Sequence, residues 1–150
     1  MSISIGSKAP DFKSTNQDGE EVSLSQYKGK KIVLYFYPKD NTPGCTTQAC
    51  DLRDNHERLL VAGYVILGIS PDDEVSHQKF ISKFDLPFDL IADTEKEITN
   101  AYGIWREKKN YGKTYMGVVR TTFIIDEDGV IIDIIEKVKT KEHSNQILPV

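Results

Sequence analysis

Long apolar runs, rich in β-branched and aromatic residues, alternate along this chain with segments in which apolar and polar positions follow a helical spacing. The runs "KKIVLYFYP" (30–38), "YVILGIS" (64–70) and "TTFIID" (121–126) have the pattern of strands buried on both faces of a sheet. A fourth run, "GVIIDIIE" (129–136), follows the turn "DEDG" and predicts an antiparallel hairpin with 121–126.

Helical spacing is expected over 43–62, 73–84, 94–102 and a short segment from about 141. Near the N-terminus, "PDFKSTNQDGEEVSLS" predicts two short strands around the turn "QDGE". Strands that alternate with helices indicate an α/β fold with a central sheet, parallel in part, and the 121–136 hairpin makes that sheet mixed. No repeat, low-complexity tract or linker divides the sequence, so we expect one domain over 1–150.

The composition is that of an ordinary globular protein, with 39% hydrophobic and 28% charged residues. A net charge of −4 and scattered basic residues argue against a nucleic-acid partner. The stretch from Arg106 to Lys113 is predicted to be a solvated loop. The first residues do not resemble a secretory signal, and no apolar run approaches the roughly 20 residues of a membrane span. We therefore expect no membrane partner and a cytoplasmic location.

The chain has two cysteines, and both lie in "YPKDNTPGCTTQAC" (37–50). Where thiols are kept reduced, neighbouring cysteines favour catalysis, redox sensing or metal binding over a permanent disulfide. Thr42 is a good N-cap and Pro43 suits the first helical position, so Cys45 is predicted in the first turn of the helix. The unpaired N–H groups and the helix dipole there favour a thiolate over a thiol.

Cys50 follows five residues after Cys45, which is neither a CxxC redox pair nor a metal-binding spacing. On a helical wheel Cys45 shares an inward stripe with Ala49, Leu52, His56, Leu59 and Leu60, whereas Cys50 is rotated by about 140°. In an intact helix the two Cα atoms lie roughly 8.7 Å apart, beyond the ~6.8 Å limit of a disulfide. The two thiols can therefore pair only if the first turn unwinds.

Simpler interpretations of these residues remain open at this point. Buried cysteines often pack as small, unreactive apolar side chains. Zinc is disfavoured because there is no second cysteine pair and the histidines lack ligand spacing, so we predict no metal site. His56, on the apolar stripe, is expected to be a core histidine, and His77 and His143 are expected to be solvated.

Several motifs together resemble the peroxiredoxin family. "PKDNTPGC" (38–45) matches the P-x-x-x-T-x-x-C active-site loop, and "GSKAPDF" (6–12) matches the G-x-x-A-P-x-F entry. "YFYPKDNTPGCTTQACDLRD" (35–54), "AYGIW" (101–105) and "GKTYMGVVRTTFIIDEDG" (112–129) are similar to the peroxiredoxin Q, or bacterioferritin comigratory protein, subfamily. The resemblance spans roughly residues 6 to 136 and implies a thioredoxin-like sandwich.

The resemblance also implies a role for each residue of the loop. Cys45 matches the peroxidatic cysteine, whose thiolate attacks a peroxide and becomes a sulfenic acid. Thr42 and Arg120 match the side chains that bind the thiolate and the peroxide, and Pro38 matches the proline that shields the pocket. N–H groups near Gly44 and Cys45 would stabilise charge on the breaking O–O bond.

Cys50 matches the resolving cysteine, which would form a disulfide with Cys45 that a thioredoxin or similar dithiol protein reduces. The resemblance implies antioxidant peroxidase activity on hydrogen peroxide and organic hydroperoxides, with no metal, haem or flavin. Members of the subfamily are monomers or dimers, and we expect a monomer. Gln48, three residues after Cys45, occupies a position that is often Gln or Glu in the family, and it is interpreted as a supporting and not a chemical group.

Two other functions compete with the peroxidase interpretation. A thioredoxin-like thiol–disulfide oxidoreductase shares the fold, but its second cysteine belongs at CxxC spacing, and Thr42 and Arg120 would have no role in it. A redox-sensing or metal-delivery module, such as a copper-assembly protein, uses CxxxC and a later histidine, which this sequence lacks. Consumption of peroxide would indicate the peroxidase, reduction of insulin disulfides would indicate the thiol–disulfide oxidoreductase, and a stoichiometric bound metal would indicate the metal-delivery module.

Overall fold

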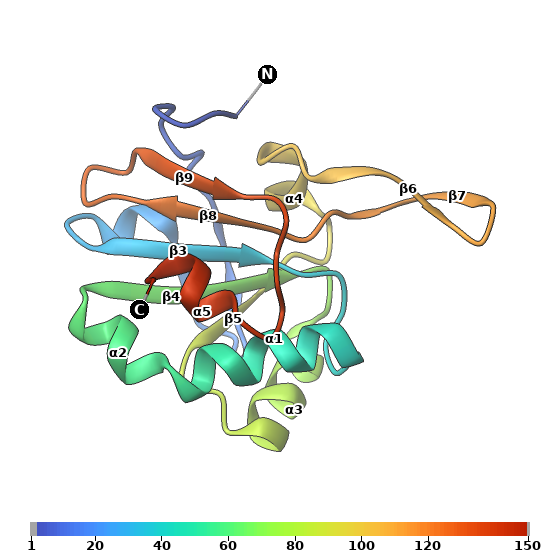
Figure 1. Ribbon diagram of the computed structural model, residues 1–150, viewed down its shortest axis with the longest axis horizontal. Helices are drawn as coiled ribbons and strands as arrows, with labels where there is room; N and C mark the ends of the chain where they lie inside the picture. The colour runs from blue at the N-terminus through green and yellow to red at the C-terminus, as the bar shows by residue number, and fades with distance from the viewer. Residues whose placement is uncertain (1–2, 150) are drawn as a thin grey trace.

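The computed structural model describes residues 3–149, which build a mixed β-sheet covered by helices (Figure 1). Within these residues the strand order is β2-β1-β5-β4-β3-β8-β9. β3, β4 and β5 are parallel to one another, whereas the β1–β2, β1–β5, β3–β8 and β8–β9 pairs are antiparallel. The strands are β1 (Lys13–Asn16), β2 (Glu21–Ser23), β3 (Lys31–Phe36), β4 (Tyr64–Ser70), β5 (Asp89–Ala92), β8 (Thr121–Ile125) and β9 (Ile131–Ile135). The predicted mixed sheet, its C-terminal hairpin and its N-terminal hairpin are confirmed.

The helices divide between the two faces of the sheet. One face packs against α1 (Pro43–Asp54), α2 (His56–Val61), α3 (Glu74–Phe84) and α5 (His143–Ile147). Figure 1 draws α1, α2 and α3 below β4, and α5 across the middle strands. The other face packs against α4 (Glu97–Ala101) and the 3-10 turn η1 (Leu24–Tyr27). The fold is therefore a sandwich with two apolar cores, one on each side of the sheet.

The central strand β3 contributes to both cores. Leu34 and Phe36 pack in the cluster shared with α4, whereas Val33 and Tyr35 pack in the cluster shared with α1 and α3. All four are at most 1% exposed. Because successive side chains of a strand point to opposite faces, a strand with helices on both sides must be apolar throughout. The continuous run 30–38 predicted this environment correctly.

The single helix predicted over 43–62 is instead two helices that meet at Asn55. The Asn55 side chain donates a 2.9 Å hydrogen bond to the carbonyl of Asp51, so it competes with the regular backbone pattern. The change of direction leaves Leu60 half exposed, whereas the helical wheel had placed it on the buried stripe. His56 is half-buried and packs beside the ring of Phe88, with the ring centroids 6.1 Å apart.

The sequence pattern did not reveal three strands. β5 is only four residues long and lies in a stretch that carries no strong periodicity. β6 (Trp105–Asn110) and β7 (Lys113–Val118) form a separate hairpin that projects from the body of the molecule in Figure 1. Tyr111 and Gly112, both with positive φ, make its two-residue turn, which suits a twisted hairpin. Arg106, Glu107 and Lys109 are exposed, as expected for this stretch, but the stretch is part of a hairpin and not a loop.

Candidate active site

The first turn of α1 places Cys45 at the carboxyl end of β3. Thr42 has the extended backbone of an N-cap residue, Pro43 is the first helical residue, and the N–H of Thr46 donates to the carbonyl of Thr42 over 2.8 Å. Cys45 points into the core and is 1% exposed. The predicted start of the helix and the inward direction of the thiol are both confirmed.

The hydroxyl of Thr42 does not cap the helix. Its Oγ1 donates a 2.8 Å hydrogen bond to the carbonyl of Lys39 and makes no capping bond with the N–H groups of α1. A hydroxyl has one hydrogen to donate, so its lone pairs are left to accept. Thr42 therefore presents an acceptor to its surroundings. It is the N-cap residue, as predicted, by its backbone position and not through its side chain.

Arg120 reaches Cys45 from the neighbouring strand. The antiparallel register of β3 and β8 pairs Phe36 with Thr121, so Arg120, one residue earlier, lies next to the end of β3. Arg120 Nη2 donates to Cys45 Sγ over 3.2 Å. A guanidinium bonded to sulfur stabilises a thiolate over a thiol, as do the free N–H groups of the helix start.

Gln48 orients Arg120 from the third position after Cys45 on α1. Arg120 Nη1 donates to Gln48 Oε1 over 2.6 Å, and the Gln48 side chain is fully buried. Residues three apart on a helix share a face, so Gln48 and Cys45 hold the two ends of one guanidinium. The sequence predicted only a supporting role for Gln48. Its position three residues after Cys45, on the same helical face, was the feature that pointed to this contact.

Gly44 borders the guanidinium of Arg120, and Pro38 lies at the start of the loop that leads to Cys45. A Cβ placed on Gly44 would lie 3.2 Å from Arg120 Nη2, which is tighter than ordinary contact. The missing side chain of Gly44 therefore leaves room for the guanidinium. Pro38 is half-buried and ends the extended segment that leads into the loop.

Cys50 lies on the same continuous helix as Cys45, and both are free thiols. Cys45 is buried, whereas Cys50 is partly exposed, as the helical wheel predicted. With α1 regular from Pro43 to Asp54, the two sulfurs cannot meet without unwinding of the residues between them.

Two histidines are placed very differently from the prediction. His77 and His143 are fully buried, not solvated. His77 bonds to Asp40 and to the carbonyl of Ile91, and His143 bonds to Thr122 and Gln146. A buried histidine needs hydrogen-bond partners for its ring nitrogens. The partners of His77 lie 37 and 14 positions away in the sequence, so the local sequence pattern does not reveal them. His56 is half-buried, so the expected core position holds only in part.

Among residues 3–149 no group of three or more histidine, cysteine, aspartate or glutamate side chains could hold a metal ion. None of the helices in that range is long and apolar enough to cross a membrane. The site therefore consists of a thiol in the first turn of a helix, hydrogen-bonded by a guanidinium at the carboxyl end of the central strand β3. Such a fold and site define a thiol-dependent oxidoreductase of the thioredoxin-like class.

The family model of the AhpC/TSA family matches residues 5–134. The chain is 53% identical over 148 residues to peroxiredoxin Bcp of Bacillus subtilis (strain 168), covering 99% of this chain and 94% of that one. It is 42% identical over 146 residues to peroxiredoxin Bcp of Escherichia coli (strain K12), covering 97% and 94%.

Solved structures agree with these relatives. The bacterioferritin comigratory protein of Xanthomonas campestris, studied for alkyl peroxide reduction, superposes with a TM-score of 0.88 at 32% identity, covering 97% of this chain and 93% of that one. A cysteine-to-serine mutant of Xylella fastidiosa PrxQ gives a TM-score of 0.92 at 28% identity, covering 99% and 94%. The chain belongs to the AhpC/TSA family and, within it, to the peroxiredoxins of the PrxQ/Bcp type. It is a peroxidase, an enzyme of the oxidoreductase class, and such an enzyme uses a peroxide and a thiol reductant.

Proposed function

We propose that this protein reduces hydrogen peroxide and organic hydroperoxides through Cys45, resolves the product through Cys50, and is recycled by a thioredoxin or similar dithiol protein. The observation that carries the proposal is the 3.2 Å hydrogen bond from Arg120 Nη2 to Cys45 Sγ. A cation bonded to a buried sulfur at a helix start favours the nucleophilic form of the thiol.

In the first step the Cys45 thiolate attacks the terminal oxygen of the peroxide. The S–O bond forms as the O–O bond breaks, sulfur is oxidised to sulfenic acid, and the leaving oxygen takes a proton to become water or an alcohol. Arg120 would stabilise the charge that moves from sulfur onto the leaving oxygen, together with the N–H groups at Gly44 and Cys45. Thr42, whose hydrogen is used on Lys39, would accept a hydrogen bond from the peroxide O–H. Pro38 would exclude water from the pocket.

In the second step the Cys50 thiol attacks the sulfenic sulfur, water leaves, and the Cys45–Cys50 disulfide forms. The regular helix between them must unwind first. A disulfide in an unwound surface segment is open to attack by an external dithiol protein, which becomes oxidised as it restores the two thiols. The partial exposure of Cys50 supports the access of such a dithiol protein to the disulfide.

The decisive experiment is a thiol count by intact mass before and after one equivalent of hydrogen peroxide. We expect a loss of two hydrogens, mapped by peptide digestion to Cys45 and Cys50. Cys45→Ser should abolish the reaction, and Arg120→Ala should slow it by about 100-fold, the usual cost of losing a charge-stabilising donor. Cys50→Ser should gain one oxygen and then fail to recycle with thioredoxin. Two free thiols with no added oxygen would reject the proposal.

A protein-disulfide reductase is the remaining alternative, and the insulin reduction assay separates it from the peroxidase. The spacing of Cys45 and Cys50 within an unbroken helix disfavours it, because a CxxC pair can exchange without unwinding. A monomeric state is part of the proposal and is checked by light scattering. The cytoplasmic location expected from the sequence stays a prediction.

A further inference from the structure

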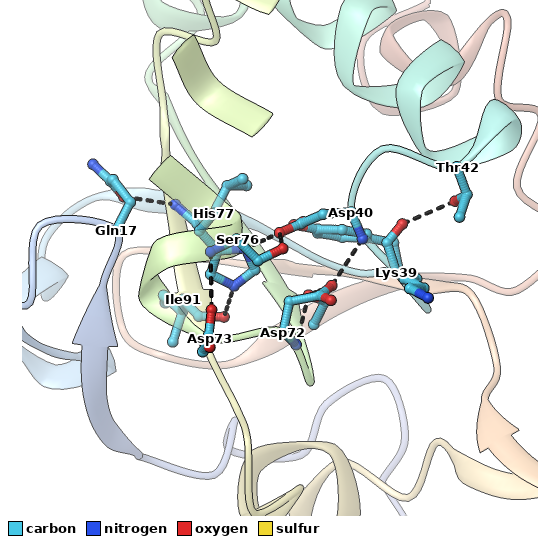
Figure 2. A network of polar contacts seen from close by, with 12 residues as sticks. Gln17, Lys39, Asp40, Thr42, Asp72, Asp73, Ser76, His77 and Ile91 are labelled. Carbon is cyan, nitrogen blue, oxygen red and sulfur yellow. Dashed lines mark hydrogen bonds and ion pairs between the residues drawn. The ribbon is translucent and has the colours of Figure 1, made fainter. Parts of the chain in front are cut away.

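A buried polar network lies behind the loop that joins β3 to α1, and its centre is the carboxylate of Asp40 (Figure 2). Tyr37 donates to Asp40 Oδ1 over 2.5 Å, and Ser76 donates to Oδ2 over 2.8 Å. His77 Nδ1 lies 2.7 Å from the same Oδ2. The side chains of His77 and Asp40 are 0% and 3% exposed. None of the residue roles described above uses this network.

The tautomer of His77 follows from its two partners. Nδ1 faces the Asp40 carboxylate, and Nε2 faces the carbonyl of Ile91 at 3.0 Å. Both partners are acceptors, so a ring nitrogen without hydrogen would turn a lone pair towards an oxygen. The arrangement is satisfied when both nitrogens carry hydrogen, which makes the imidazole a cation.

His143 provides the contrast within the same molecule. It is as deeply buried as His77, but its Nε2 lies 2.8 Å from the hydroxyl of Thr122, which can donate, and only Nδ1 faces an acceptor, Gln146 Oε1. A neutral ring satisfies both contacts. Burial also lowers the pKa of His143. The two buried histidines therefore differ in charge because of what surrounds them.

Asp40 is held as an anion by the donors around it. Burial, followed by the charges of Tyr35 and Asp40, raises the pKa of Tyr37 well above its usual range, so that phenol keeps its hydrogen and donates. With Tyr37, Ser76 and His77 all donating, the carboxylate needs no proton of its own. The other ionisable groups around Asp40 are Asp72, which accepts from its N–H, and Asp73, Lys79 and Lys83, which line the same pocket.

The same network fixes the backbone of the active-site loop. The N–H of Asp40 donates to Asp72 Oδ2 over 2.8 Å, and Ser70 Oγ donates to that same oxygen over 2.7 Å. Asn41 follows with a positive φ of 59°, a left-handed conformation that asparagine tolerates better than most residues. The loop is therefore held by contacts from β4 and α3 just before Thr42 and Cys45.

The charge of Asp40 is relevant to the thiol because the loop that carries Asp40 leads directly to Cys45. Asp40 is five residues from Cys45, and the charges of Asp40 and Cys45 both contribute to raising the pKa of the Tyr35 hydroxyl, after burial as the main cause. The carboxylate and the thiolate thus act on one small region. Two uncompensated negative charges there would oppose each other.

We propose that His77 is a positioning residue for the peroxide step: its doubly protonated ring pairs with Asp40, locks residues 38–42 in place, and cancels a buried negative charge beside the thiolate. His77 does not touch the reacting atoms. The part of this inference that concerns the rate of peroxide reduction rests on the proposed function, whereas the charge state of the ring does not.

The first test uses the unmodified, reduced protein. We expect the nitrogen chemical shifts of His77 to show hydrogen on both ring nitrogens at neutral pH, while His143 shows hydrogen on Nδ1 alone. Assignment comes from the spectra of His77→Asn and His143→Asn. A His77 ring with hydrogen on only one nitrogen in the folded protein would overturn the proposal, whatever the enzyme does with peroxide.

The second test measures the rate of Cys45 alkylation against pH in Cys50→Ser backgrounds, which needs no peroxide. His77→Asn keeps a donor for Asp40 but removes the positive charge. In general, a unit charge roughly 10 Å from a titrating group, at an effective dielectric of about 20, moves the midpoint of that group by roughly one pH unit. We therefore expect the alkylation midpoint to rise by that amount, and the rate of peroxide reduction to fall by up to about tenfold at pH values below the wild-type midpoint.

The matched variants separate charge from packing. Asp40→Asn combined with His77→Asn is again neutral and should return the midpoint to near the wild-type value. His143→Asn makes the same substitution at an equally buried but neutral histidine, and should leave the midpoint unchanged. If the double variant is shifted as far as His77→Asn alone, the effect is one of packing and the proposal is wrong. If the midpoints behave as expected but no variant consumes peroxide, the proposed function fails and the charge assignment stands.

Discussion

Arg120 Nη1 donates a 2.6 Å hydrogen bond to Gln48 Oε1, and this contact aims the other arm of the guanidinium at Cys45. The acceptor is a neutral amide, so the charge of Arg120 is not neutralised by a carboxylate and remains available to the sulfur. The orientation of the arginine therefore depends on a residue of the helix that carries the thiol.

Gln48→Ala should slow the peroxide step by about tenfold, because Arg120 loses the bond that orients it. Gln48→Glu keeps an acceptor at the same place but pairs Arg120 with a carboxylate, so its rate should fall between those of Gln48→Ala and the wild type. Thr47→Ala is the matched control, since Thr47 bonds only to the carbonyl of Pro43 in its own helix. Single-turnover mixing with hydrogen peroxide measures all three, and an unchanged rate in Gln48→Ala would contradict the orienting role.

Gly44→Ala should separate stability from activity. The added Cβ would lie 3.2 Å from Arg120 Nη2, and the flexible arginine would move away from the sulfur. Alanine is favoured over glycine in helices by up to about 1 kcal/mol, so the free energy of unfolding should be unchanged or slightly higher. We expect a slower peroxide step with an unchanged or raised melting temperature. A destabilised protein with a normal rate would show that the backbone, not Arg120, had moved.

Oxidation should unwind α1 only as far as Asp51. Asp51 Oδ2 accepts a 2.7 Å hydrogen bond from the N–H of Ser144, and Arg58 Nη1 donates to the carbonyl of Leu148 over 2.7 Å. These hydrogen bonds connect α5 and the residue after it to the last turn of α1 and to α2. Hydrogen exchange of residues 43–50 should rise sharply when the disulfide forms, because their backbone bonds are lost, while residues of α3 stay unchanged as an internal control.

The Asp51→Ala variant tests that limit. Without the bond to Ser144, the exchange that follows oxidation should extend into the remainder of α1 and into α5. Protection of α5 equal to that of the wild type would mean that α5 does not restrain the unwinding.

Stability should fall as the pH drops through the range in which histidine titrates in the unfolded chain. Burial, the largest cause, lowers the pKa of His143 below the ~6.5 of a free histidine. The unfolded state then binds more protons than the folded state, so stability is retained above about pH 6.5 and lost below it. His143→Asn should reduce the difference in melting temperature between about pH 7.5 and about pH 5.5. If the melting temperatures of the wild type and of His143→Asn differ equally between the two pH values, other groups cause the loss of stability. His56 is one such group, because burial also lowers its pKa.

Much of the fold was readable from local pattern. The apolar runs that became β3, β4 and β8 are buried on both faces, and strands of that kind need no alternation to be recognised. The hairpin β6–β7 was missed because most of its residues are exposed and only its base, Trp105 and Val118, packs against the core. β5 was missed because four residues carry little periodicity. Both failures arise where the apolar pattern is weak.

The sequence by itself determined where the thiol lies. Thr42 and Pro43 start a helix, and that start places Cys45 in a first turn and Cys50 out of reach on the same helix, because caps and helical spacing act over a few residues. Only the tertiary structure decided what surrounds the thiol. The register of β3 with β8 brings Arg120 to a cysteine 75 positions away, and α3 brings His77 to Asp40 across 37 positions. A buried charge is stable only with a partner, and these partners are supplied by the packing of distant elements.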